Sequence, residues 1–273
     1  MLRFFRHIRR DALTNHRIVR YSWYALGEIL LVVVGILIAL QINNWNEEQI
    51  EQRQIRGYLL KLAADLKRDV EMVDPVAQQI RRVIHHSDEL ADYVRERSIE
   101  EIENAELFFL TSGMGYRPYS WNRAALEQLK SSGAMRQIAN DQLTDRISAY
   151  DALTHHLDQD HENDQRKIEE VELVANRVID RNYPERAAIN TWLYQIGDED
   201  LLNRTRAFRD TVLFENMKQQ DLPLLTDDGE AIRLLVNQML NARADLDSRV
   251  DLELPRLRGW ADEIIALIEA DYR

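Results

Sequence analysis

The residues with the clearest capacity for chemistry are histidines that occur in pairs. Two pairs are present, and an acidic side chain follows the second at helical spacing: His85, His86, His155, His156 and Asp160. Residues four apart lie on the same face of an α-helix, so His156 and Asp160 can point at one ion. An imidazole and a carboxylate are typical ligands of a divalent metal. We therefore expect metal binding or pH sensing at these residues, with a solvated polar helix face as the alternative.

Motifs of the common enzyme classes are absent from the sequence. It contains no cysteine, and the spacings HExxH, GxSxG, GxGxxG and GxxxxGK[ST] do not occur. Zinc peptidases, serine hydrolases and most phosphate-binding loops depend on such spacings. We therefore assign no catalytic residue and no cofactor. A metal-dependent enzyme built on the histidine pairs is the alternative.

The segment 111–120 is a second candidate site, because it combines glycines and a proline with aromatic residues around one arginine. Glycine and proline predict a loop. Aromatic and arginine side chains on a surface loop are typical of recognition sites. We expect a partner-binding loop made of Tyr116, Arg117, Tyr119 and Trp121. The alternative is that the aromatic rings pack into the end of the folded domain.

The elements that would position these residues begin with one very apolar stretch. From Trp23 to Ile42 the only strongly polar residues are Glu28 and Gln41. Twenty helical residues extend about 30 Å, which is the thickness of the hydrocarbon core of a bilayer. Aromatic side chains, which favour the membrane interface, flank the stretch: Tyr21, Trp23, Tyr24 and Trp45. No small-residue cleavage site follows, so the sequence predicts an uncleaved signal anchor.

The charges around this span predict its orientation. Six arginines and one aspartate precede it, and three glutamates follow before the next arginine. Arginine and lysine accumulate on the cytoplasmic side of a membrane span. The sequence therefore predicts a cytoplasmic basic segment (1–20), a transmembrane anchor (21–45) and an extracytoplasmic domain (46–273).

Small residues and one acid inside the span predict a contact with another helix. The residues concerned are Gly27, Glu28, Gly35 and Ala39. Gly35 and Ala39 stand four apart and allow a second helix to approach closely. Glu28 is costly as a buried charge and is therefore a functional candidate. We expect a homo-oligomer or a protein partner at this face, and a lone helix is the alternative.

Two segments resemble a known family. Residues 24–47 read YALGEILLVVVGILIALQINNWNE, and residues 121–133 end in LKSSG. Both are similar to segments of a family of uncharacterised bacterial single-pass membrane proteins. The resemblance implies an inner-membrane protein with a cytoplasmic N-terminus and a periplasmic helical domain. It implies no activity and no catalytic residue.

After the span, apolar residues recur every three or four positions, which predicts helices. The longest stripes run from Ile55 to Val94, through residues 143–178 and through residues 232–268. Short connections favour antiparallel neighbours. We therefore expect an all-α fold in which an N-terminal transmembrane helix precedes an elongated antiparallel helical bundle. Parallel coiled-coil dimerisation is the alternative use of these stripes.

The overall charge limits the partners. The chain has 47 Asp+Glu against 35 Lys+Arg and a formal net charge of −12. Proteins that bind nucleic acid normally present a basic face. We therefore expect membrane lipid and protein as partners, and no nucleic acid. The composition supports an interaction or sensing module, with an oligomeric scaffold as a further alternative.

Overall fold

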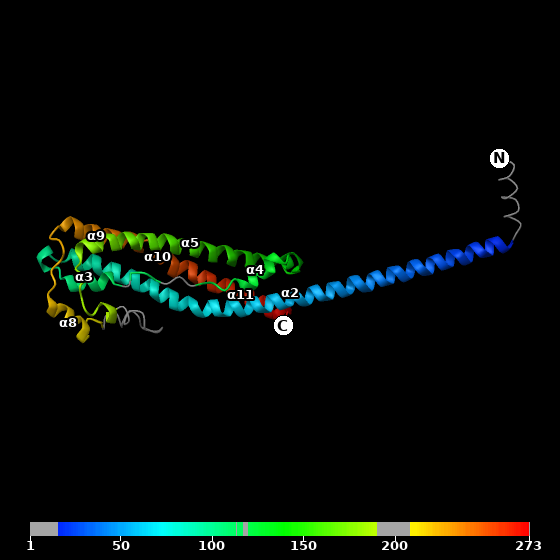
Figure 1. Ribbon diagram of the computed structural model, residues 1–273, viewed down its shortest axis with the longest axis horizontal. Coiled ribbons are helices and arrows are strands. Elements are labelled where there is room, and N and C mark those ends of the chain that lie inside the picture. Colours follow the sequence, from blue (N-terminus) through cyan, green and yellow to red (C-terminus); the bar gives the residue numbers. More distant parts are fainter. Residues whose placement is uncertain (1–15, 113, 117–119, 190–207, 273) are drawn as a thin grey trace, which may run out of the picture. The chain divides into compact units, whose positions relative to one another are not determined.

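Helices make up nearly all of the structure. The computed structural model describes residues 16–112, 114–116, 120–189 and 208–272, and no strand occurs among them (Figure 1). The α-helices are α2 (His16–Arg95), α3 (Asn104–Thr111), α4 (Ala124–Ser131), α5 (Asp141–Val178), α8 (Val212–Gln220), α9 (Gly229–Arg243), α10 (Leu246–Ser248) and α11 (Leu254–Tyr272). Two 3₁₀ turns, η1 (Ile99–Glu101) and η2 (Ala134–Gln137), and one π-helical turn, η3 (Arg249–Glu253), join them. The all-α fold class is confirmed.

The chain divides within α2 into two compact units, Met1–Gly57 and Tyr58–Arg273. In the first unit, every residue from Ser22 to Gln54 is exposed. This unit contains the most apolar part of α2, where an 18-residue window has a mean hydropathy of 2.5. Such a helix is long and apolar enough to cross a membrane.

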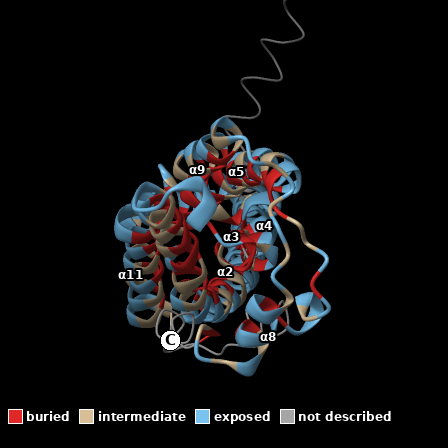
Figure 2. Cartoon of the chain, turned by 90° about the vertical axis from the view of Figure 1, so that its left-hand side faces the viewer, coloured by how far each residue is buried: buried red, intermediate tan, exposed pale blue. Residues whose placement is uncertain are grey.

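The second unit is a helical bundle built from three long rods. The rods are residues 58–95 of α2, the helix α5, and the series α9, α10, η3 and α11 (Figure 1). Their apolar stripes turn toward one another and are buried, while the outer faces are exposed (Figure 2). This is the arrangement expected of amphipathic helices around one core.

The third rod runs antiparallel to the other two, as expected. Ion pairs along its length join Lys167 of α5 to Asp245, and further down Arg146 to Glu263. The first two rods, however, run parallel to each other. The Tyr150 hydroxyl donates to Asp69 at 2.7 Å, and further along the chain residues 76 and 80 of α2 line one small cavity with residues 157 and 161 of α5. Residue numbers therefore increase in the same direction along α2 and α5.

The parallel direction follows from the connection between α3 and α4. Arg82 donates to the Gly115 carbonyl oxygen at 3.0 Å, and the Asn122 amide side chain donates to Asp69 at 2.8 Å. The connection therefore places Gly115 and Asn122 along α2 in the order opposite to that of α2 itself. It returns the chain to the end of the bundle where residue 58 lies, and α5 starts from there.

Several helix ends agree with the sequence. The Asn140 side chain accepts from the Leu143 amide at 3.1 Å and caps α5. Gly133 follows α4 with a φ of 77°, a conformation that favours glycine. Ser98 and Glu101 form a capping box, and the helical segment that follows is split into η1 and α3.

The two helical prolines behave differently from each other. A proline inside a helix usually kinks or breaks it, yet α2 is continuous through Pro75. Packing supports the helix there, because Arg258 lies 2.8 Å from Asp74 and also donates to the Val70 carbonyl oxygen at 3.4 Å. Pro255 follows the π-helical turn η3, in which the Leu254 amide bonds to the Arg249 carbonyl oxygen. Because Arg258 pairs with Asp74, Pro255 and Pro75 lie at a similar level in the bundle.

Candidate functional site

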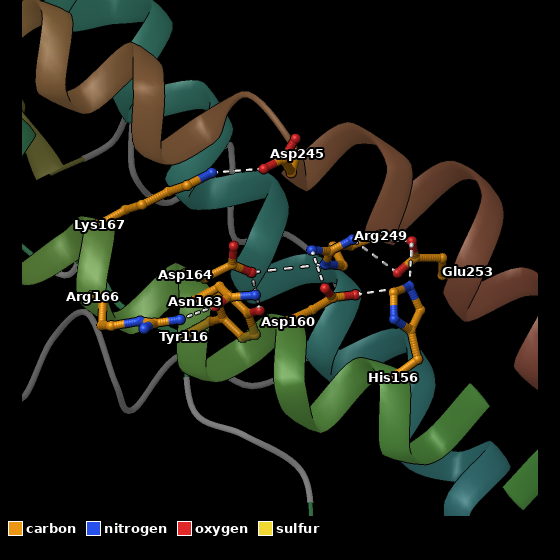
Figure 3. A network of polar contacts seen from close by, with 10 residues as sticks. All are labelled: Tyr116, His156, Asp160, Asn163, Asp164, Arg166, Lys167, Asp245, Arg249 and Glu253. Carbon is orange, nitrogen blue, oxygen red and sulfur yellow. Dashed lines mark hydrogen bonds and ion pairs between the residues drawn. The ribbon is translucent and has the colours of Figure 1, made fainter. Parts of the chain in front are cut away.

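A buried polar network occupies a gap in the apolar stripe of α5. Leu157 and Ile168 belong to the stripe, but Asp160 and Asp164 lie between them and are only 9% and 1% exposed. A carboxylate that leaves water needs a compensating partner. The partners come from the third rod and from the segment before α4 (Figure 3).

Arg249 is the centre of the network. Its side chain extends from the π-helical turn η3 and the residue is 7% exposed. Its guanidinium lies 3.1 Å from Asp160, 3.8 Å from Asp164 and 3.0 Å from Glu253 (Figure 3). A guanidinium offers five N–H donors and can serve several carboxylates at once. One cation therefore faces three carboxylates.

Tyr116 closes the inner end of the network. Its hydroxyl donates to Asp164 at 2.7 Å. Burial raises the pKa of Tyr116, and the adjacent Asp164 carboxylate raises it further, so the phenol stays protonated. Burial also raises the pKa of Asp164, against the opposing effects of the Tyr116 hydrogen bond and Arg249. A cavity of ≈ 30 Å³, about the room that one water needs, lies beside Tyr116 and Arg249.

His156 forms the outer, solvent-facing end. Its Nε2 lies 3.2 Å from an Asp160 oxygen and 3.8 Å from a Glu253 oxygen (Figure 3). The side chain of His156 is 54% exposed, while those of Asp160 and Glu253 are 12% and 15% exposed. These three residues are the one group in the described part of the chain whose nitrogen and carboxylate oxygen atoms converge closely enough for a metal.

Comparison with known proteins places the chain in a family. Residues 28–181 match a family of unknown function, DUF6090. The chain belongs to this family. No curated protein and no solved structure matches the chain. The DUF6090 region includes the apolar part of α2 from Glu28 onward and all of α5, so it contains His156, Asp160 and Asp164. Arg249 and Glu253 lie after it.

The other predicted metal ligands do not join this group. His155 faces Asp151 at 3.7 Å, and His85 faces Glu89 at 3.2 Å. Because Tyr150 lies level with Asp69, 81 positions earlier in the chain, His85 is level with about residue 166. At about 1.5 Å per helical residue, it stands roughly 16 Å further along the bundle than His155. The two histidine pairs of this DUF6090 chain therefore do not converge on one ion, because α2 and α5 are parallel.

His86 is a core residue. It is fully buried, and its ring centroid lies 5.3 Å from that of Phe109. Neither ring nitrogen has a hydrogen-bond partner among the residues that the structure describes. Burial, assisted by the nearby Arg82 guanidinium, lowers the pKa of His86 to about 3. The imidazole is therefore neutral at physiological pH and packs as an aromatic ring.

The predicted partner-binding loop needs correction. Tyr116 and Trp121 are buried, at 7% and 9% exposure, so they are not available as a contact surface. These two residues follow the alternative, in which the aromatic rings pack into the folded domain. The buried Tyr116 hydroxyl donates a hydrogen bond to Asp164. Arg117 and Tyr119 lie outside the described residues.

The residues assigned to the membrane span lie on the exposed part of α2. Trp23, Tyr24 and Trp45 are exposed, and so are Glu28 and Ala39. A β-carbon added at Gly27 or Gly35 would meet nothing within 4 Å. The space beside both glycines is therefore open. The side chain of Tyr21 lies outside the described part.

Sequence reasoning missed Arg249 and Glu253, and one signal could have found them. Apolar residues are missing from the α5 stripe over the turns that hold Asp160 and Asp164. Core positions with acidic residues require a cation from another element. On the third rod, Arg249 stands beside the buried Val250, and it is the arginine that lies deepest there.

Proposed function

We propose that this DUF6090 protein is a single-pass membrane protein that holds a helical interaction or sensing module on the outer side of the bacterial inner membrane. Residues 21–45 are the anchor, residues 1–20 lie in the cytoplasm, and the bundle lies in the periplasm. No enzymatic activity is part of the proposal.

One observation carries the anchor. From Ile29 to Val34, six consecutive large apolar side chains are exposed, so the apolar surface covers the whole circumference of the helix. A helix that docks on a protein surface needs only one apolar stripe, whereas a helix that is apolar all round belongs in a core or a bilayer. Removing each such side chain from water is worth about 1.5–3 kcal/mol. Lipid can cover all sides of the helix at once.

The orientation rests on charge. The six arginines before the span favour the cytoplasmic side. The glutamates directly after the span do not favour the cytoplasmic side. Basic residues near the ends of a span determine its orientation more strongly than acidic residues do.

A second helix is the expected partner within the membrane. The open space beside Gly35, with Ala39 one turn later, suits close helix packing. A second copy of this chain or another single-span protein can occupy this face. Such a contact would let the periplasmic module communicate with a partner.

Extraction from membranes tests the anchor. We expect the full-length protein to stay in the membrane pellet at alkaline pH. Lysines at Val33 and Leu37 should make it extractable, because each costs about 2.5–3.5 kcal/mol at the centre of a span. The matched control places the same charges after the span, with Gln49→Lys and Gln54→Lys, and should stay in the pellet. Extraction of the unmodified protein would overturn the proposal.

A further inference from the structure

The outer end of the buried network has the composition of a metal site. It brings one imidazole nitrogen, from His156, to two carboxylates, from Asp160 and Glu253. Two of these ligands stand four apart on α5, and the third comes from η3 on the neighbouring rod (Figure 3). We propose that His156, Asp160 and Glu253 bind a divalent transition-metal ion of the zinc type and so tie α5 to the third rod.

The distances support tetrahedral coordination. Zinc lies about 2.0–2.1 Å from histidine nitrogen and carboxylate oxygen, so two ligand atoms of one tetrahedral site are about 3.3 Å apart. The His156 Nε2 lies 3.2 Å from Asp160 Oδ2 and 3.8 Å from Glu253 Oε1. Three protein ligands leave the fourth position to water or to an exogenous ligand.

Asp160 supplies an independent observation that points to a cation-binding role. The residue is nine-tenths buried, and within the described part of the chain its Oδ2 atom accepts no hydrogen bond, although the His156 Nε2 lies 3.2 Å away. Its other oxygen, Oδ1, is already held by Arg249 at 3.1 Å. A buried carboxylate oxygen without a donor is costly, and a metal ion would satisfy it.

Charge balance favours the same conclusion. Among the arginines and lysines that the structure describes, Arg249 is the one in direct contact with Asp160, Asp164 and Glu253. A single guanidinium compensates one of three carboxylates, so the cluster retains negative charge in a largely buried place. A dication beside His156 would neutralise the remainder.

Arg249 positions two of the carboxylates of the proposed site. Its Nη1 contacts both Glu253 oxygens, at 3.0 and 3.1 Å. Metal binding through Oε1 would lengthen one of these contacts and leave the other in place. The arginine thus holds both carboxylates in position by contacting oxygens of Asp160 and Glu253.

The type of ion follows from the ligands. Imidazole suits zinc and its neighbours, whereas magnesium prefers six oxygen ligands and several retained waters. We therefore expect Zn²⁺ to bind at least tenfold more tightly than Mg²⁺.

Equilibrium dialysis of the full-length protein against Zn²⁺, after treatment with a chelator, tests the site. We expect one Zn²⁺ per chain, and a loss of affinity of about 100-fold in both His156→Ala and Asp160→Asn. His155→Ala is the matched control, because His155 is equally exposed and faces Asp151 but has no third ligand nearby. Its affinity should not change.

Thermal unfolding gives a second measurement. Zn²⁺ should raise the Tm of the unmodified protein and of His155→Ala, but not of His156→Ala, since a ligand of the folded state stabilises it. Zinc binding well below one per chain, equal binding of Mg²⁺, or equal effects of the two histidine substitutions would each overturn the proposal. The test does not depend on the membrane anchor.

Discussion

The buried imidazole of His86 makes the stability of the bundle depend on pH. Its pKa is about 3 in the folded protein, mainly because of burial, against an ordinary value of 6.5. Below pH 6.5 the unfolded chain therefore binds a proton that the folded chain does not. Stability is full above pH 6.5 and falls as the pH drops toward 3. Each pH unit in this range costs about 1.4 kcal/mol.

A urea denaturation series measures this effect. Between pH 6.5 and pH 5, His86 should account for a loss of about 2 kcal/mol of unfolding free energy. His86→Leu keeps a side chain of similar size against Phe109. Over the same pH interval, this variant should lose about 2 kcal/mol less unfolding free energy than the unmodified protein. His155→Gln is the control, because the His155 side chain is 55% exposed, and it should behave like the unmodified protein. Parallel pH profiles for His86→Leu and the unmodified protein would contradict this account.

Individual residues of the buried network differ in how far the sequence could predict their contacts. The pairing of His156 with Asp160 could be predicted, because both stand on one helix four residues apart. The contributions of Arg249, Glu253 and Tyr116 could not, because each comes from an element whose place depends on the fold. The gap in the α5 stripe indicates that such partners exist, but it does not name them.

At the level of elements, one glycine position ends a helix and another lies inside one. Gly133 follows α4 with a φ of 77°, whereas Gly259 lies in α11 with open space where a β-carbon would stand. Gly133→Ala should destabilise the bundle by about 1 kcal/mol, because alanine disfavours a positive φ. Gly259→Ala should stabilise it by up to about 1 kcal/mol, because alanine favours a helix interior.

Chemical denaturation of the two alanine variants checks this pair. The same substitution is predicted to act with opposite sign at the two positions, so differences in side-chain chemistry cancel. Destabilisation by Gly259→Ala, or no effect of Gly133→Ala, would show that the helix boundaries near these residues differ from those described.

Helix boundaries were more predictable than helix directions. The caps at Gly133 and Asn140 depend on local hydrogen bonds and backbone angles, which neighbouring residues specify. The parallel course of α2 and α5 depends instead on a long-range contact, in which Asn122 binds Asp69. Nothing in the local sequence indicates that Gly115 and Asn122 lie in reverse order along α2. Because α2 and α5 are parallel, the two histidine pairs lie at different levels of the bundle.

For the whole molecule, the central claim is that the apolar part of α2 spans a membrane and leaves the bundle outside the cytoplasm. The absence of cysteine makes this claim directly measurable, because a single introduced cysteine is the only thiol in the chain. Asn15→Cys lies before the span. Ser148→Cys lies in α5 at an exposed position.

The decisive measurement is the labelling of these two variants in spheroplasts with a maleimide that does not cross membranes. The account predicts that Ser148→Cys is labelled in intact spheroplasts and that Asn15→Cys is labelled only after the membrane is permeabilised. Labelling of Asn15→Cys in intact spheroplasts, with Ser148→Cys protected until permeabilisation, would contradict the account.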